Sequence, residues 1–149
     1  MMRQIDSIVI HCTATPNLQD IGFTEINTGH KQRGWRDPAG VSCGYHFLIR
    51  RNGVIEVGRT PDMIGAHVEG ANSRSLGVAL IGTSSFNTSQ IESLRRLVKS
   101  LTTQYPGAKV YPHNWYPSAK KQGKTCPVID LRVALKGLEE TFGEWVASP

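Results

Sequence analysis

The chain has 149 residues, a formal net charge of +5, 39% hydrophobic residues and 19% charged residues. This composition excludes a disordered chain, and the length suits one domain with a core of its own. The apolar runs are too short to span a membrane, and the N-terminal stretch MMRQIDSIVIHC lacks the apolar segment of a signal peptide. We therefore expect synthesis in a cytoplasm. The positive charge favours anionic partners such as nucleic acid, a membrane surface or a cell wall, although a basic protein without such a partner fits equally well.

The first predicted element is a buried strand over residues 6–11, because residues 8–10 are three consecutive β-branched apolar residues. The strand ends in His11, a titratable side chain next to residues that have the pattern of a core. A short helix is predicted next, with Thr24 as its N-cap and its end near Gly34.

A β-hairpin follows this helix. Residues 45–50 and 54–57 flank the dipeptide Asn52-Gly53, which is the strongest short-range signal for a hairpin turn. A further buried strand is predicted over residues 75–82.

An amphipathic helix is predicted from Ser89, which forms a capping-box pattern with Glu92, to the stop at Pro106-Gly107. A short strand over residues 109–111 and a polar loop over residues 114–125 come next. Asp130 is expected to cap a last helix, whose inner face carries Leu131, Ala134, Leu135, Leu138 and Phe142.

The order of these elements predicts the fold class. Strands are mixed with helices, one hairpin is present, and no linker or repeat interrupts the chain. We therefore expect a single α/β domain over residues 1–149, with a mixed central β-sheet flanked by helices.

Two histidines stand at the ends of predicted strands, and one cysteine stands at the end of the polar loop that leads back toward the same edge of the sheet. His11 and His113 stand at strand ends, and Cys126 ends the polar loop. Sheet edges of this kind hold the sites of α/β proteins. Two imidazoles and a thiolate leave a fourth position open for water on a zinc ion, as in catalytic sites. However, a histidine beside an apolar run is more often a packed residue, and these long spacings match no short metal motif.

Five further residues could ligate a metal ion: Cys12, Cys43, His46, His67 and His30. Cys12 is expected to point away from His11, because side chains alternate along a strand. Cys43 could chelate together with His46, but His46 would lie within a hairpin strand and is expected to pack there. The cysteines are odd in number and form no Cys-x-x-Cys pair, so a disulfide framework is not expected.

Four segments occur in a characteristic order: IVIHCTAT, HKQRGWRDPAGVSCGYHFLIRRNGVIEVGR, GAHVEGANSRSLGVALIG and KTCPVID. In this order they resemble the zinc-dependent N-acetylmuramoyl-L-alanine amidases, in particular the short single-domain phage endolysins, and the peptidoglycan recognition proteins that share their fold. The resemblance extends from about Ile8 to Asp130. It implies hydrolysis of the amide between N-acetylmuramic acid and the L-alanine of the stem peptide, with one zinc ion per chain.

The resemblance also implies roles for individual residues. It implies three zinc ligands: His11, His113 and Cys126. Tyr45 matches a catalytic tyrosine beside the metal-bound water, and Lys124 matches a lysine that stabilises the transition state. His67 and Asn72 match residues of the substrate cleft. Without the resemblance, Tyr45 would be interpreted as a residue that packs within a strand. Lys124 would be interpreted as a solvated charge, and His67 as a polar residue of a loop. The sequence departs from the family pattern at Ala66, at Asn114-Trp115 and at Val128.

We therefore expect a peptidoglycan hydrolase that acts as a monomer on muramyl peptides, as a phage or prophage lysin that reaches the wall after the membrane is breached. A cytoplasmic amidase that recycles wall fragments fits the sequence equally well. A non-catalytic peptidoglycan-binding protein is a further alternative, although such proteins in this fold usually lack the zinc cysteine that Cys126 matches. A nucleic-acid partner is not expected, because the chain has no basic helix, stacking motif or zinc-finger spacing.

Overall fold

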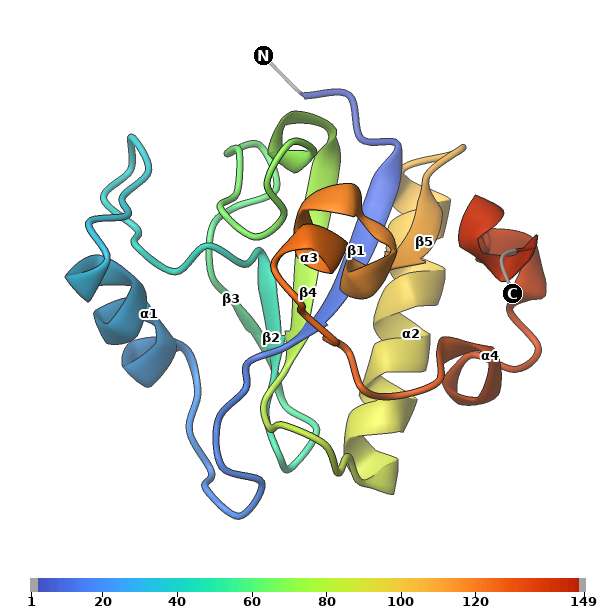
Figure 1. Cartoon of the computed structure of the whole chain (residues 1–149), viewed down its shortest axis with the longest axis horizontal. Helices are drawn as coiled ribbons and strands as arrows, with labels where there is room; N and C mark the ends of the chain where they lie inside the picture. The colour runs from blue at the N-terminus through green and yellow to red at the C-terminus, as the bar shows by residue number, and fades with distance from the viewer. Residues whose placement is uncertain (1–2, 148–149) are drawn as a thin grey trace.

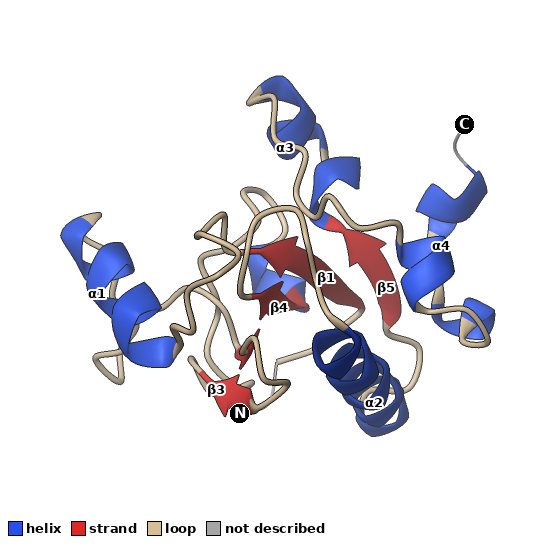
Figure 2. Cartoon of the chain, turned by 90° about the horizontal axis from the view of Figure 1, so that it is seen from below, coloured by secondary structure: helices blue, strands red, loops and turns tan. Residues whose placement is uncertain are grey.

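The computed structural model describes residues 3–147, which form a five-stranded β-sheet with helices on both faces (Figures 1 and 2). The strands are β1 (Ser7–Cys12), β2 (Phe47–Ile49), β3 (Ile55–Val57), β4 (Ser75–Leu80) and β5 (Lys109–Pro112). The α-helices are α1 (Phe23–Gln32), α2 (Thr88–Gln104), α3 (Pro117–Lys121) and α4 (Leu131–Ala134). Short 3-10 helices span Asn72–Arg74, His113–Trp115, Glu139–Thr141 and Glu144–Ala147. The predicted fold class is confirmed.

The strand order places the first strand of the chain between two later ones. The order is β3-β2-β4-β1-β5, and β3 alone runs antiparallel to its neighbour in the sheet. In this register His11 lies beside Ala79 of β4, and Ile10 lies beside Pro112 of β5. Parallel strands end at the same edge of a sheet. The end of β1 and the residue after β5, His113, therefore come together.

The two faces of the sheet are covered differently. Helix α2 lies against one face, whereas α1 and α3 lie on the other (Figure 2). The predicted apolar face of α2 is largely confirmed, since Leu94, Leu97, Val98 and Leu101 are buried in the main core. A smaller cluster, in which Ile26 of α1 packs near Leu48 and Ala79, belongs to the opposite face. This second face also carries His11, because His11 and Ala79 are neighbours in register.

Helix α2 begins earlier than the sequence predicted. Its N-cap is Asn87, whose Oδ1 accepts the backbone N–H of Gln90 at 3.0 Å, and the Gln90 side chain accepts the N–H of Asn87. The capping box predicted at Ser89 and Glu92 is therefore wrong, and Ser89 lies exposed in the first turn. Gln90 is also fully buried and donates to the backbone oxygens of Ile49 and Ile81, which joins the start of the helix to the sheet.

The Asn87 cap gives a prediction about stability. Asn87→Ala should lower the free energy of unfolding by about 1 kcal/mol, because one backbone N–H of the first turn loses its partner. Thermal unfolding monitored by circular dichroism would show the change as a melting temperature lower by roughly 2–4 °C. Ser89→Ala is the matched control and should shift the midpoint by less than about half as much. A larger fall in melting temperature for Ser89→Ala than for Asn87→Ala would show that Ser89 caps the helix, as the sequence predicted.

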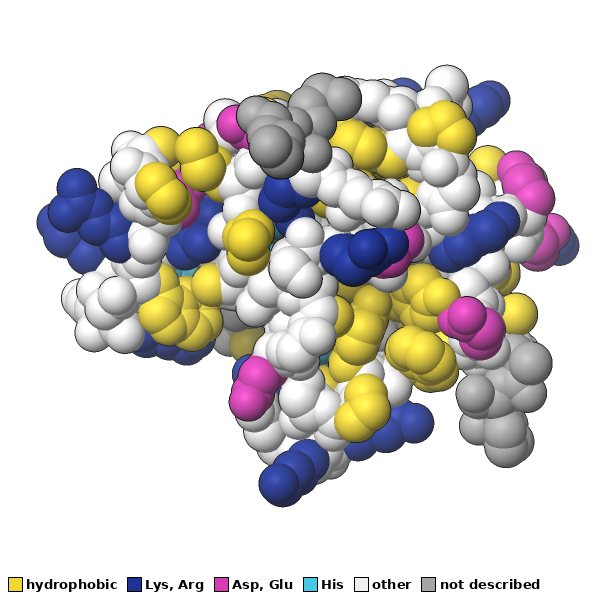
Figure 3. Space-filling view, turned by 90° about the horizontal axis from the view of Figure 1, so that it is seen from above, with side chains coloured by type: hydrophobic (Ala, Val, Ile, Leu, Met, Phe, Trp, Pro, Cys, Tyr) yellow, Lys and Arg dark blue, Asp and Glu magenta, His cyan; other side chains and the backbone are white. Residues whose placement is uncertain are grey.

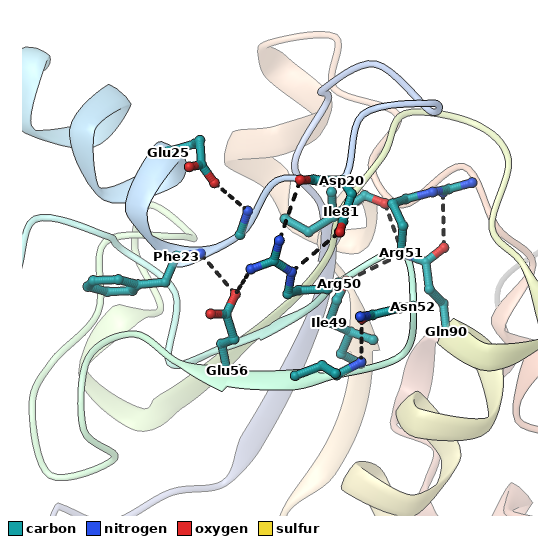
Figure 4. A network of polar contacts seen from close by, with 12 residues as sticks. Asp20, Phe23, Glu25, Ile49, Arg50, Arg51, Asn52, Glu56, Ile81 and Gln90 are labelled. Carbon is teal, nitrogen blue, oxygen red and sulfur yellow. Dashed lines mark hydrogen bonds and ion pairs between the residues drawn. The ribbon is translucent and has the colours of Figure 1, made fainter.

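A network of charged side chains fixes the start of α1 to the hairpin (Figure 4). Arg50, at the end of β2, pairs with Asp20 at 3.3 Å and with Glu56 of β3 at 3.5 Å. Glu56 Oε1 accepts the backbone N–H of Phe23 at 3.0 Å. The helix begins after Gly22 rather than at the predicted cap Thr24, and a Cβ at Gly22 would collide with the Arg50 and Glu56 side chains.

The predicted hairpin is confirmed, with strands shorter than expected. Strands β2 and β3 pair through Phe47–Ile49 and Ile55–Val57, and Gly53 in the turn has the left-handed φ of 87°. Glycine adopts this conformation without the clash that a Cβ would cause.

The last third of the chain departs most from the prediction. The segment predicted as a loop over residues 114–125 contains α3, which begins at Pro117. Asp130 caps α4 as predicted, since its side chain accepts the N–H of Arg132. The helix ends at Ala134, however, and Gly137 has a φ of 94°, which a continuous helix does not allow.

Among residues 3–147, no helix is long and apolar enough to cross a membrane.

Candidate active site

His11 lies at the end of β1 with a rigid core behind it. Residues 8–10 are completely buried, and the His11 side chain is 1% exposed. It forms part of the lining of a cleft of about 700 Å³ on the α1 face of the sheet. In the view of Figure 3, only small parts of the histidine side chains reach the surface.

His113 follows β5 directly and faces His11. The centroids of the two imidazole rings are 4.3 Å apart. The His113 side chain is 7% exposed, and its Nδ1 atom is buried without a hydrogen-bond partner in the described chain. A buried polar atom without a partner is costly. It is therefore explained most simply by a ligand that occupies the space in front of it.

Cys126 completes a cluster of three donors. One ligand atom each from His11, His113 and Cys126 lies within 4.8 Å of the others, which is the only such group of histidine, cysteine and carboxylate residues within residues 3–147. The Cys126 Sγ accepts the backbone N–H of Cys12 at 2.7 Å. The structure thus brings together the three residues that the sequence singled out as a ligand set.

The position of Cys12 corrects one prediction. Alternation along the strand placed the Cys12 side chain away from His11, but Cys12 lines the same cleft, and its thiol lies near enough to Cys126 for that thiol to lower the pKa of Cys12. The reason is that Cys12 ends β1 and Cys126 lies across the end of the strand.

The electrostatics of the cluster suit a cation. Burial lowers the pKa of His11 well below its ordinary value, and burial followed by the Lys124 ammonium lowers the pKa of His113 to about 4. Both imidazoles are therefore neutral and keep a lone pair for a metal ion. The neighbouring Cys12 thiol and burial raise the pKa of the Cys126 thiol. Two neutral imidazoles and a thiol fit a zinc ion, and one of the imidazoles, that of His113, has a nitrogen without a partner among residues 3–147. Binding of zinc would release the thiol proton.

Tyr45 and Lys124 both line this cleft. The Tyr45 ring lies 5.1 Å from the His11 ring, and its hydroxyl forms no hydrogen bond with any described residue. Burial and the neighbouring thiols raise the pKa of Tyr45, so the hydroxyl stays protonated and can donate. Lys124 is exposed, and its charge reaches both histidines of the cluster, because it lowers the pKa of each.

The two walls of the cleft come from different parts of the chain. His30, Arg33 and Trp35 contribute from the end of α1. On the other side, Glu69 is joined to α3 and the residue after it, through Ser118 at 2.9 Å and Gln122 at 3.0 Å. The volume lies in the range of small-molecule binding sites.

His67 and Asn72, the predicted substrate-binding residues, lie in the lining of the cleft and make contacts within the protein. His67 Nδ1 lies 2.9 Å from His11 Nε2, and His67 Nε2 lies 3.2 Å from the Ser75 hydroxyl. Asn72 Oδ1 accepts the backbone N–H groups of His67 and Val68, both at 2.9 Å. The sequence did not indicate the contact of Ser75 with His67, because Ser75 has the pattern of the first residue of a buried strand.

The other candidate ligands lie apart from the cluster. His46 is completely buried, and its two ring nitrogens contact Gly77 N and Met63 O, so the predicted packing role agrees with its position. His30 Nδ1 accepts the N–H of Gly44 and its ring packs 4.7 Å from Trp35. Cys43 is buried beneath Tyr45, whose backbone oxygen accepts its S–H.

Comparison with known proteins identifies relatives over most of the chain. The N-acetylmuramoyl-L-alanine amidase family matches residues 1–128. The chain is 38% identical to the endolysin of Klebsiella phage KP32 over 138 residues, which cover 87% of this chain and 85% of that protein. It is 37% identical to the endolysin of Escherichia phage T7 over 135 residues, with 85% and 83% covered. The N-acetylmuramoyl-L-alanine amidase LysC from Clostridium intestinale URNW superposes with a TM-score of 0.75 at 28% identity, covering 92% of this chain and 87% of LysC.

Proposed function

We propose, for a chain that belongs to the N-acetylmuramoyl-L-alanine amidase family and is a peptidoglycan hydrolase, that catalysis uses zinc. In this proposal residues 1–149 act as one catalytic domain. The bond cleaved is the amide between N-acetylmuramic acid and the L-alanine of the stem peptide. One zinc ion per chain is held by three side chains: His11, His113 and Cys126. When bound, zinc lowers the pKa of a water molecule toward about 7 and polarises the carbonyl group of the substrate.

The cluster of three donor atoms within 4.8 Å carries this proposal. His11 lies in β1 and His113 directly follows the adjacent strand β5, so the sheet holds both residues in place. The backbone N–H of Cys12 donates to the Cys126 sulfur and stabilises its thiolate form. Three protein ligands leave one position open, as in catalytic zinc sites.

Tyr45 and Lys124 act on the charge that develops during hydrolysis. Negative charge builds on the carbonyl oxygen of the amide as the tetrahedral state forms. The Lys124 ammonium provides a counter-charge at the cleft, and the protonated Tyr45 hydroxyl provides a donor. Pre-positioned donors of this kind stabilise the transition state more than the substrate.

The substrate lies in the cleft between the end of α1 and α3. Arg33 and Lys124 place positive charge at its margins, which suits the carboxylates of a peptide stem. The substrate contacts predicted for His67 and Asn72 stay predictions, as does the monomeric state. The place of action that we propose is the bacterial cell wall.

Metal analysis and product analysis test this proposal together. The metal-replete protein should contain about one zinc per chain, and His11→Ala should lose most of it, because one of three ligands is gone. His30→Ala is the matched control, since His30 lines the same cleft but its Nδ1 is bonded to Gly44. Full zinc content in His11→Ala would refute the ligand assignment.

The same preparations identify the reaction and the biological role. Incubation with intact peptidoglycan should release new L-alanine amino termini, as an endolysin would. Cleavage restricted to soluble muramyl peptides would indicate the recycling role instead. Binding of muramyl peptide without any new amino termini would indicate a non-catalytic binding protein.

A further inference from the structure

A chain of buried hydrogen bonds extends from His11 into the protein. His11 Nε2 lies 2.9 Å from His67 Nδ1, and His67 Nε2 lies 3.2 Å from Ser75 Oγ. The Ser75 hydroxyl is also 2.8 Å from the backbone oxygen of Ala71. The three side chains are between 0% and 9% exposed, so water does not compete for these bonds.

The last acceptor fixes the direction of every bond in this chain. A carbonyl oxygen can only accept, so the single proton of the Ser75 hydroxyl is donated to Ala71. The Ser75 oxygen must then accept from His67 Nε2–H. In a neutral imidazole one nitrogen donates and the other accepts, so His67 Nδ1 is the acceptor for His11 Nε2–H.

The surroundings of His67 support the neutral ring that this argument requires. The ring contacts two other histidines, His11 and His46, at centroid distances of 5.0 and 5.7 Å. No salt bridge joins His67 to a carboxylate within residues 3–147. A buried charge without a partner is strongly disfavoured.

We propose that His67 is a positioning residue, which through Ser75 and the Ala71 carbonyl holds His11 in the Nε2–H form and so leaves the His11 Nδ1 lone pair for the metal ion. This inference rests on the proposed function of His11 as a ligand. A ligand whose second nitrogen is bonded has both its tautomer and its ring orientation fixed.

The backbone around His67 is shaped for this role. A Cβ at Gly77 would lie 2.6 Å from the His67 ring, and a Cβ at Gly65 would lie 2.7 Å from it, so two glycines make room for the imidazole. Asn72 holds the backbone of His67 from a third side. Both nitrogens of His67 are engaged within the protein.

Histidine tautomers in the metal-free protein give the first test. Long-range ¹H–¹⁵N spectra of the ¹⁵N-histidine-labelled chain should show His11 protonated at Nε2. His67→Phe and Ser75→Ala should both mix the two tautomers. His67→Asn should restore the single form, because its Oδ1 stands on Cγ as Nδ1 does and can accept from His11. Ser93→Ala is the control, since Ser93 is equally buried and donates to the Gly53 oxygen, remote from any histidine.

Zinc affinity, measured by competition with a chelator, gives the second test. His67→Phe should weaken binding about 10–100-fold, as expected for the loss of a partner behind a metal ligand, with His67→Asn closer to the parent. Ser93→Ala should bind zinc as the parent does. Protonation of His11 at Nδ1 in the parent protein, or unchanged tautomer and affinity in both His67→Phe and Ser75→Ala, would overturn the proposal. If the parent has the Nε2–H tautomer but binds no zinc, the hydrogen-bond chain stands and the proposed function fails.

Discussion

Cys126→Ser should empty the metal site and lower peptidoglycan hydrolysis by more than about a hundredfold, since even one lost oxyanion donor costs about 10²–10³ in rate. A serine hydroxyl stays protonated near neutral pH and is a harder, poorer zinc ligand than a thiolate. The two histidines alone then hold the ion weakly. Zinc content and wall lysis, measured on the same preparation, test this expectation.

The same variant should still bind the substrate. The walls of the cleft come from α1 and from Glu69 with α3, and they do not depend on the Cys126 sulfur. Calorimetric titration with a muramyl tripeptide should therefore show affinity close to that of the parent, because binding of the ground state and catalysis are separable.

Cys43→Ser is the matched control for this experiment. It makes the same chemical change at a buried thiol outside the cluster, and it should leave the zinc content unchanged. Lysis at the parent rate by Cys126→Ser would rule out the proposed zinc-dependent hydrolysis. Absence of lysis by the parent protein, with good binding of the peptide, would indicate a receptor.

Lys124→Met should reduce turnover about 10²–10³-fold, the loss typical of one donor at a developing oxyanion, and leave the zinc site occupied. Lys124 is exposed, so its loss should change the stability by no more than about 0.5 kcal/mol. Tyr45→Phe should also lower turnover without a large loss of stability, because its hydroxyl has no partner among the described residues. Turnover, zinc content and melting temperature are the measurements required.

Lys121→Met provides the comparison for the lysine variant. Lys121 is an exposed residue of α3 three positions earlier and does not line the cleft. Its substitution should leave turnover unchanged. A marked fall in melting temperature with normal turnover per folded molecule in Lys124→Met or Tyr45→Phe would show that these residues pack rather than catalyse.

Local patterns predicted the elements that hold the site. The β-branched run before His11 and the Asn52-Gly53 turn both gave elements that the structure contains. Their signals are local, because a buried strand and a two-residue turn are specified by adjacent residues. The ligand set required the family resemblance, since its members are far apart in the sequence.

What the sequence did not reveal depends on contacts between distant segments. The chain from His67 through Ser75 to Ala71 is a tertiary arrangement, and Ser75 looks like any small residue in a strand. Helix α3 has five mostly polar residues and no apolar periodicity, so its pattern resembles a loop. Gly137 was compatible with a helix in the sequence, but its left-handed φ ends the regular structure.

The position of β1 between β4 and β5 has a consequence for the time at which the enzyme becomes active. Both neighbours of β1 are made long after it, and proteins dominated by such non-local pairings fold slowly. His11 and His113 stand about 100 positions apart, so at about 5–20 residues per second a ribosome makes the second roughly 5–20 s after the first. During that interval the nascent chain lacks at least one of the three proposed zinc ligands. If these residues bind the catalytic zinc, the capacity for hydrolysis therefore arises only after β5 has been made and has joined the sheet.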